Sequence, residues 1–145
     1  MNDTPTLTGQ DIGQAERATR ALLDTVLAET DTTFHQSVVL NLTSTTASPA
    51  ESDGVVERMA HGLKIDPAEA RRAIDEAVAD GLVTERGDPV SLALTPAGEA
   101  RLRAIRSGIE RIAERLYGDL PPDDLATTHR ILAIVTERAN AELAG

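Results

Sequence analysis

The chain of 145 residues contains no cysteine and almost no aromatic side chains. Without cysteine there are no disulfides and no thiolate metal sites, and a sensor that works through thiol oxidation is excluded. Phe34 and Tyr117 are the only aromatic residues, so the core must be aliphatic and rich in alanine. Such a core suits closely packed helices, and an extended obligate interface would add buried area that a single lobe lacks.

Long apolar runs and an excess of basic charge are also missing. No apolar stretch approaches the roughly 20 residues that cross a bilayer, and the polar residues 1–10 lack the basic and apolar regions of a signal peptide. We therefore expect a cytoplasmic protein with no membrane partner and a disordered start over residues 1–10. The 14 basic and 24 acidic side chains give a net charge of −10, which argues against non-specific binding to nucleic acid.

The most definite helix signal begins at Asp66. Asp66 can cap the helix, Pro67 suits its first position, and Glu69 can complete a capping box. Gly81 stands where a left-handed residue ends many helices. The intervening apolar residues recur at helical spacing: Ala70, Ile74, Ala77 and Val78.

Two short strands and a further helix follow. Leu82–Arg86 and Val90–Leu94 are strand candidates, because apolar and polar residues alternate in the second of them, and Gly87-Asp88-Pro89 supplies the turn. Thr95-Pro96 opens the next helix. This order of elements is typical of a winged helix.

A helix with a similar start precedes Asp66. Ser48-Pro49-Ala50-Glu51 repeats the capping pattern, and an apolar stripe runs from Val55 to Leu63. Only residues 62–65 separate the two helices, with Ile65 placed as a hydrophobic staple. A short connection that contains glycine is what a helix-turn-helix requires.

The remaining segments predict helices at both ends of the chain. Apolar spacing favours a helix over residues 11–30, and Phe34–Leu42 favours a short buried helix, although its β-branched residues leave a strand possible. Thr43–Ser48 reads as a polar loop. An a/d seam predicts a helix from Ala97 to Tyr117, and a last helix follows the break at residues 120–124. No linker divides the chain, so we expect one domain over residues 1–145.

Four segments together resemble the multiple antibiotic resistance regulator (MarR) family of bacterial winged-helix transcription factors. They are the helix end ARRAIDEAVADGLV, the wing remnant at residues 86–89, the junction LTPAG at residues 94–98, and the tail LYGDLPPDDL. Each is weak alone, but their order and spacing are hard to obtain by chance. The resemblance covers nearly the whole chain.

The resemblance implies a mainly α-helical winged helix-turn-helix over residues 34–95, with a small two-stranded β wing. It also implies long N- and C-terminal dimerisation helices, residues 11–30 and 100–145. A homodimer would place its recognition helices in successive major grooves of a palindromic double-stranded DNA operator, and a small-molecule or stress signal would release the DNA. The interface candidates are Leu22, Val26, Leu132, Val135 and Ala139.

Arg72 is the best candidate for DNA contact. On a helical wheel it lies almost opposite the apolar stripe, with Ala68 and Glu69 beside it. The alternative is a surface ion network with Glu76 and Glu69. Glu69 itself either accepts a hydrogen bond from a cytosine amino group or repels phosphate.

Three further basic residues complete the DNA-binding candidates. Arg71 contacts a phosphate or merely pairs with Asp75 in solvent, and Arg86 contacts the DNA backbone or pairs with Glu85 or Asp88. Lys64 lies in the turn between the two helices. However, residues 34–95 hold five basic and ten acidic side chains, a net charge of −5, and the wing lacks the family's arginine-rich tip. We therefore expect weak or conditional DNA binding.

Phe34 and His35 are the candidates for an effector site, because the family's pocket lies where the dimer helices meet the winged lobe. The alternative for His35 is a histidine at the edge of the core. His35, His61 and His129 show no metal-type spacing, and no catalytic set can be assembled, so we expect no metal, no cofactor and no enzyme activity.

These patterns predict a MarR-like DNA-binding regulator, a dimeric repressor that a small-molecule ligand releases. A different function is left open by the charge: a winged-helix interaction module that has lost DNA binding and instead binds a protein partner or a small ligand.

Overall fold

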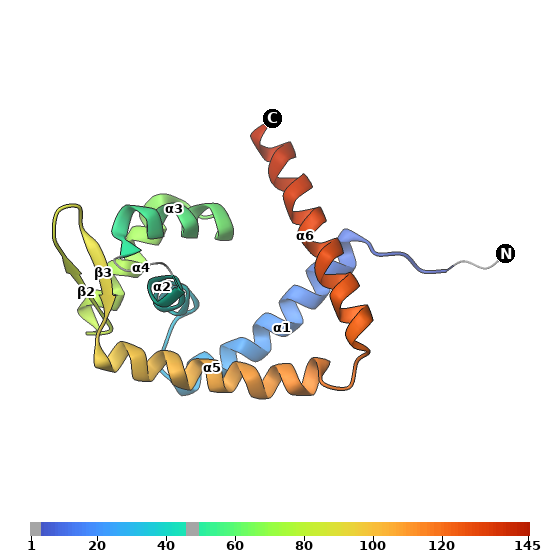
Figure 1. Ribbon diagram of the computed structural model, residues 1–145, viewed down its shortest axis with the longest axis horizontal. Helices are drawn as coiled ribbons and strands as arrows, with labels where there is room; N and C mark the ends of the chain where they lie inside the picture. The colour runs from blue at the N-terminus through green and yellow to red at the C-terminus, as the bar shows by residue number, and fades with distance from the viewer. Residues whose placement is uncertain (1–3, 46–49) are drawn as a thin grey trace. The chain divides into compact units, whose positions relative to one another are not determined.

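The computed structural model describes residues 4–45 and 50–145 of the chain. These residues fall into two compact units, Met1–Ile109 and Glu110–Gly145. The boundary lies inside helix α5 (Pro96–Tyr117) and not in a linker. Figure 1 shows the order of the elements. The expectation of a single domain over the whole chain stays a prediction.

Helix α1 (Gly9–Glu29) begins earlier than expected. Thr8 and Asp11 form a reciprocal capping box, in which Thr8 N–H donates to the Asp11 carboxylate at 2.9 Å and Asp11 N–H donates to Thr8 Oγ1 at 3.2 Å. The prediction of disorder up to residue 10 is therefore wrong from Thr8 onward, because this cap orders the first turn. Residues 1–3 lie outside the described residues.

Helix α2 (Phe34–Thr45) confirms the helical reading of this segment. Thr33 N–H donates to Gln36 Oε1 at 3.0 Å and Gln36 N–H donates to Thr33 Oγ1 at 3.1 Å, so a second capping box starts it. The predicted loop from Thr43 is wrong as far as Thr45. The Thr43 hydroxyl donates to the Val39 carbonyl at 2.7 Å and so bonds within the helix. Residues 46–48 of that predicted loop lie outside the described residues.

Helix α3 (Ser52–Leu63) begins later than the predicted capping box at residues 48–51. Ala50–Glu51, predicted as part of its capping box, forms strand β1 instead. Ala50 is buried and pairs with Leu92, so the sheet gains a third antiparallel strand in the order β1-β3-β2. The predicted two-stranded wing is correct only for the hairpin. Ser48 and Pro49 lie outside the described residues.

Helix α4 (Pro67–Ala79) is capped as predicted by Asp66, whose carboxylate accepts from Ala68 N–H at 2.9 Å. Gly81, at φ +74°, ends it: Leu82 N–H donates to the Ala77 carbonyl and Gly81 N–H to the Val78 carbonyl. This is the Schellman pattern. Lys64, at φ +57°, forms the left-handed end of α3, so α3 and α4 make the expected helix-turn-helix.

Strands β2 (Val83–Arg86) and β3 (Ser91–Leu94) form the hairpin of the wing. Val83 pairs with Leu94 and Arg86 with Ser91, within one residue of the predicted bounds. In Figure 1 the hairpin lies beside α4, and β2 packs against that helix. The sheet thereby fixes the wing to the second helix of the helix-turn-helix.

The core of the first unit is aliphatic, as the composition predicts. Helices α2, α3 and α4 pack against one another, and α4 buries Ala70, Ala73, Ile74 and Ala77. Leu102 and Ile105 of α5 belong to the same core. Phe34 packs only at its edge. Val78, predicted in the buried stripe, is half-buried, and Ala73 takes its place.

Helix α5 approaches the turn after α4 closely. Thr95 joins them, because its N–H donates to the Leu82 carbonyl at 3.0 Å and its hydroxyl donates to the Gly81 carbonyl at 2.6 Å. Gly98 then packs on Leu82 with no room for a side chain, since a Cβ there would lie 2.0 Å from the Leu82 carbonyl oxygen. The LTPAG junction thus fixes the start of α5.

The second unit consists of the end of α5 and helix α6 (Pro122–Ala144). Asp123 and Asp124 lie in the first turn of α6, where their charge favours the helix dipole. No described residue of α6 is buried within the chain. None of the described helices is both long enough and apolar enough to span a bilayer.

Candidate nucleic-acid interface and adjoining pocket

The exposed side of α4 carries the residues predicted to read DNA. Ala68, Glu69 and Arg72 are exposed, whereas Ala70 and Ile74 are fully buried, as the helical wheel predicts. Within residues 4–45 and 50–145, Arg72 forms no hydrogen bond or ion pair. The alternative of a surface network with Glu69 and Glu76 is therefore not formed, and the guanidinium of Arg72 is available for a ligand.

Arg71, the neighbouring candidate, is already bonded to other side chains of the chain. Its guanidinium donates to the buried Ser52 hydroxyl at 2.6 Å, to Asp75 at 3.0 Å and to Glu85 on β2. Partial burial lowers the pKa of the guanidinium, but the hydrogen bonds and charges of Glu85 and Asp75 outweigh it and raise the pKa of Arg71. Arg71 therefore ties α3 and the wing to α4, a role that the sequence did not indicate.

Replacing Arg71 by alanine is expected to lower the free energy of unfolding by about 1–2 kcal/mol, because Ser52 and Glu85 lose their partner. Arg72→Ala is the matched control, and we expect it to change stability by less than about 0.5 kcal/mol. Urea titrations followed by circular dichroism measure both. Equal stability of the two variants would contradict the structural role of Arg71.

Arg86 and Lys64 are both exposed. Arg86 ends β2 and forms no ion pair with Glu85 or Asp88 in the described chain. Lys64 donates from Nζ to the His61 carbonyl at 2.6 Å, at the left-handed end of α3. Both side chains lie at the edges of the helix-turn-helix and wing, where a phosphate contact remains a prediction.

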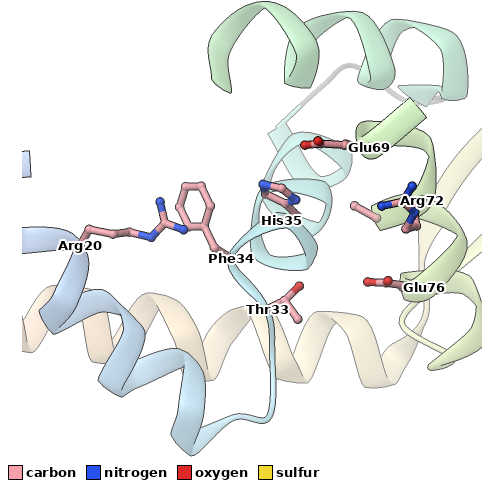
Figure 2. Close-up of a pocket in the computed structure, with 8 residues that line it drawn as sticks. Arg20, Thr33, Phe34, His35, Glu69, Arg72 and Glu76 are labelled. Atoms are coloured by element: carbon pink, nitrogen blue, oxygen red, sulfur yellow. The ribbon is translucent and has the colours of Figure 1, made fainter. Parts of the chain in front are cut away.

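A cavity of about 350 Å³ adjoins the exposed side of α4 (Figure 2). It lies between α1, the start of α2, and α4. Its lining residues are Arg20, Thr33, Phe34, His35, Glu69, Arg72, Ala73 and Glu76. The two predicted effector residues, Phe34 and His35, thus share one cavity with two predicted DNA-binding residues, Glu69 and Arg72.

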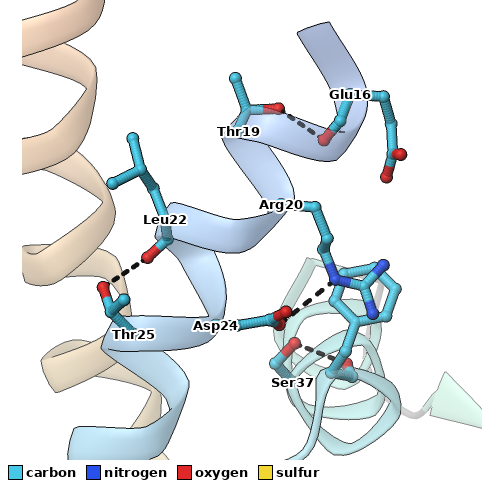
Figure 3. Close-up of polar contacts among 8 residues, drawn as sticks. Glu16, Thr19, Arg20, Leu22, Asp24, Thr25 and Ser37 are labelled. Carbon is cyan, nitrogen blue, oxygen red and sulfur yellow. Dashed lines mark hydrogen bonds and ion pairs between the residues drawn. The ribbon is translucent and has the colours of Figure 1, made fainter. Parts of the chain in front are cut away.

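Arg20 closes the α1 side of this cavity. Its guanidinium carbon lies 3.3 Å from the centre of the Phe34 ring, a cation–π contact, and its Nε lies 3.4 Å from the Asp24 carboxylate (Figure 3). The rings of Phe34 and His35 are 6.1 Å apart at 54°. No sequence pattern indicates Arg20, because its contact with Phe34 depends on how α1 and α2 pack.

The formal charges that line the cavity balance. Arg20 and Arg72 contribute two positive charges, and Glu69 and Glu76 contribute two negative ones. In Figure 2 the Glu69 and Glu76 side chains extend from α4 toward α2. With the Phe34 and His35 rings beside these groups, the cavity can hold a small ring compound that carries both an acidic group and hydrogen-bond donors.

Four of the five predicted interface residues are exposed in their own unit. Leu22 is 40% exposed, Leu132 and Val135 are 39% exposed, and Ala139 is exposed. Val26 is different, because it is 5% exposed and packs on Gly108 of α5. It offers no surface to a partner, and its prediction as an interface residue is corrected to a core role.

No family model and no curated protein matches the chain. Solved structures do match the chain in fold. Staphylococcus aureus MarR, in complex with salicylate and kanamycin, has a TM-score of 0.79 at 15% identity, covering 92% of this chain and 90% of that one. CouR of Rhodococcus jostii RHA1, bound to p-coumaroyl-CoA, gives 0.74 at 18% identity, covering 86% and 88%.

Bordetella bronchiseptica BpsR, whose DNA binding is regulated by 6-hydroxynicotinic acid, gives a TM-score of 0.74 at 23% identity, covering 92% of this chain and 98% of that one. The chain therefore has the winged-helix fold of MarR regulators, and the predicted mainly α-helical fold class is confirmed.

Proposed function

We propose that this chain is a DNA-binding transcription regulator of the MarR type, a homodimeric repressor that a small-molecule ligand releases. The observation that carries the proposal is Arg72. It is an exposed arginine without an intramolecular partner, on the second helix of a helix-turn-helix that a wing follows. Arginine on such a helix can bind guanine or phosphate through two hydrogen bonds.

Three exposed residues support phosphate contact around this helix: Lys64, Arg72 and Arg86. Ala68 and Glu69 share the same exposed side and complete the proposed reading surface. Arg71 is better explained as the residue that positions the wing, because its guanidinium is already bonded to three groups. Phosphate contacts position such a protein, and base contacts give the sequence preference.

DNA binding is tested by fluorescence anisotropy with a duplex from upstream of the chain's own gene, the operator duplex. A scrambled duplex of the same composition is the control. We expect tighter binding to the first duplex. Equal binding to both duplexes, or no binding at low salt, would contradict the proposal that the chain is a DNA-binding regulator.

The exposed apolar stripe of α6 supports the homodimer. Val135→Asp should convert the dimer to a monomer, because a carboxylate would enter an apolar contact. Ala133→Asp adds the same charge about 160° away around the helix and should leave the dimer intact. Sedimentation equilibrium measures both masses. A dimeric Val135→Asp variant would contradict the proposed interface.

The charge of the lobe favours a second candidate function. With five basic and ten acidic side chains over residues 34–95, the lobe repels nucleic acid in general. A winged-helix module that binds a protein partner or small ligand, and no longer DNA, would have this charge. Specific duplex binding in the titration above would reject this alternative.

A further inference from the structure

The wing is attached to the helix-turn-helix on both sides of its hairpin. On one side β3 pairs with β1, where Ala50 lies opposite Leu92, and Ser52 N–H donates to the Val90 carbonyl at 2.9 Å. On the other side β2 packs against α4 (Figure 1). The start of α3 therefore holds one side of the wing, and α4 holds the other.

Arg71 joins these two attachments. Its guanidinium donates to the Ser52 hydroxyl at the start of α3, at 2.6 Å, and to the Glu85 carboxylate on β2. The third bond, to Asp75 at 3.0 Å, fixes the guanidinium against α4 itself. Ser52 is buried and the Glu85 side chain is 27% exposed, so both bonds are partly shielded from water. A rotation of α4 against the wing would break at least one of these charge-assisted bonds.

The tip of the wing has the wrong chemistry for a DNA contact. Only residues 87–90 join the two strands, and they are a glycine, an aspartate, a proline and a valine. A cavity of about 410 Å³ beside the tip is lined by four carboxylates and one guanidinium, from Glu51, Asp53, Glu85, Asp88 and Arg71. Side chains that enter a minor groove are typically arginine, lysine or amides, because the groove has a negative potential. Carboxylates at the tip would instead repel the phosphates.

We infer that this wing positions α4 and does not read DNA, and that the contact between Arg71 and Glu85 is the positioning contact. This inference rests on the proposed function. The base preference then comes from the exposed side of α4 alone. Arg86, which lies at the end of β2, contributes a phosphate contact and no base contact.

Glu85→Gln tests the positioning contact, because charge and position predict opposite results. The variant removes one negative charge from an acidic lobe, so charge alone predicts tighter binding to every duplex. Loss of the contact with Arg71 predicts weaker binding to the operator duplex. We expect the ratio of operator to scrambled affinity to fall at least threefold, with no loss of affinity for the scrambled duplex. Fluorescence anisotropy measures both affinities, and circular dichroism confirms that the variant is folded.

Glu57→Gln is the matched control, since Glu57 is an exposed residue of α3 that lines none of the described wing contacts. It removes the same charge and should change the affinity ratio less than twofold. Arg71→Lys is the second variant if Glu85→Gln does not fold. An ammonium keeps the charge but cannot bond three partners as the planar guanidinium does, so the ratio should fall here too. An unchanged ratio in the folded variant would overturn the inference.

The absence of cysteine allows a direct test of the wing tip. Val90→Cys places a single thiol at the tip, where Val90 is 43% exposed, and Ala68→Cys places one on the exposed side of α4. Saturating operator duplex should slow alkylation of the Ala68→Cys thiol by iodoacetamide at least fivefold. We expect the rate for Val90→Cys to change less than twofold. Equal protection of the two thiols would place the wing tip at the DNA and overturn the inference.

These outcomes separate failure of the inference from failure of the proposed function. If the wild-type protein prefers the operator duplex but Val90→Cys is protected, or Glu85→Gln keeps the preference, only the inference fails. If the wild-type protein shows no preference, or the operator duplex leaves the Ala68→Cys thiol unprotected, α4 does not read DNA. The proposed function then fails, and the inference fails with it.

Discussion

Gly98→Ala is expected to destabilise the first unit by about 3 kcal/mol or more. The added Cβ would lie 2.0 Å from the Leu82 carbonyl oxygen, which already accepts a hydrogen bond from Thr95 N–H, and the Thr95 hydroxyl holds the neighbouring Gly81 carbonyl. To relieve this overlap, α5 must move away from the turn after α4. That movement would open the core at Leu102. Thermal or urea unfolding followed by circular dichroism measures the loss.

Gly54→Ala is the control for this variant. Gly54 also lies in a helix, α3, but a Cβ there would meet nothing within 4 Å. The replacement should therefore stabilise the protein by about 0.5–1 kcal/mol, because alanine favours the helix more than glycine does. If Gly98→Ala also raised stability, the close approach at the junction would be refuted.

Arg72→Ala should weaken operator binding by about tenfold or more, while the fold remains intact. An arginine contact to a base edge contributes about 1–3 kcal/mol, and Arg72 supports no other side chain of the described chain. Anisotropy titrations with the operator and scrambled duplexes measure the affinity, and the loss should be larger for the operator.

Arg17→Ala controls for the loss of one positive charge, since Arg17 is an exposed residue of α1 outside the proposed reading surface. We expect its operator affinity to change less than threefold at moderate salt. If both variants lowered operator affinity equally, Arg72 would contribute only through the net charge of the protein. If Arg72→Ala bound the operator as tightly as the wild-type protein, Arg72 would not contact the DNA.

Local signals in the sequence predicted most of the fold. Capping at Asp66 and the left-handed Gly81 gave the bounds of α4 within a residue or two, and the alternation before Leu94 gave β3. These features work because each depends on residues within one or two turns of chain. The aliphatic core followed from composition alone.

Contacts between distant segments could not be predicted in this way. The apolar pattern of residues 34–42 does not single out Gln36, yet it is 4% exposed and its side-chain amide donates to Asp80 at the end of α4 at 2.7 Å. Val26 fitted an interface stripe but packs on Gly108. Both depend on how helices pack, which periodicity does not determine.

In the candidate site, too, local features could be predicted and contacts between distant segments could not. The wheel placed Arg72 on the exposed side of α4 correctly, because burial follows the periodicity of one helix. It could not show that Arg71 is bonded to Ser52 and Glu85, or that Arg20 and His35 line one cavity with Arg72. The effector guess at Phe34 and His35 came from a family resemblance, and ligand binding there stays a prediction.

The most direct test of the central claim is a salt series of operator titrations with the wild-type protein. We predict preference for the operator over the scrambled duplex, with a slope of log K against log salt no steeper than about −5.5, since the two lobes of the dimer together offer about six phosphate contacts. Indistinguishable affinities for the two duplexes at every salt concentration would contradict the claim that this winged helix reads DNA.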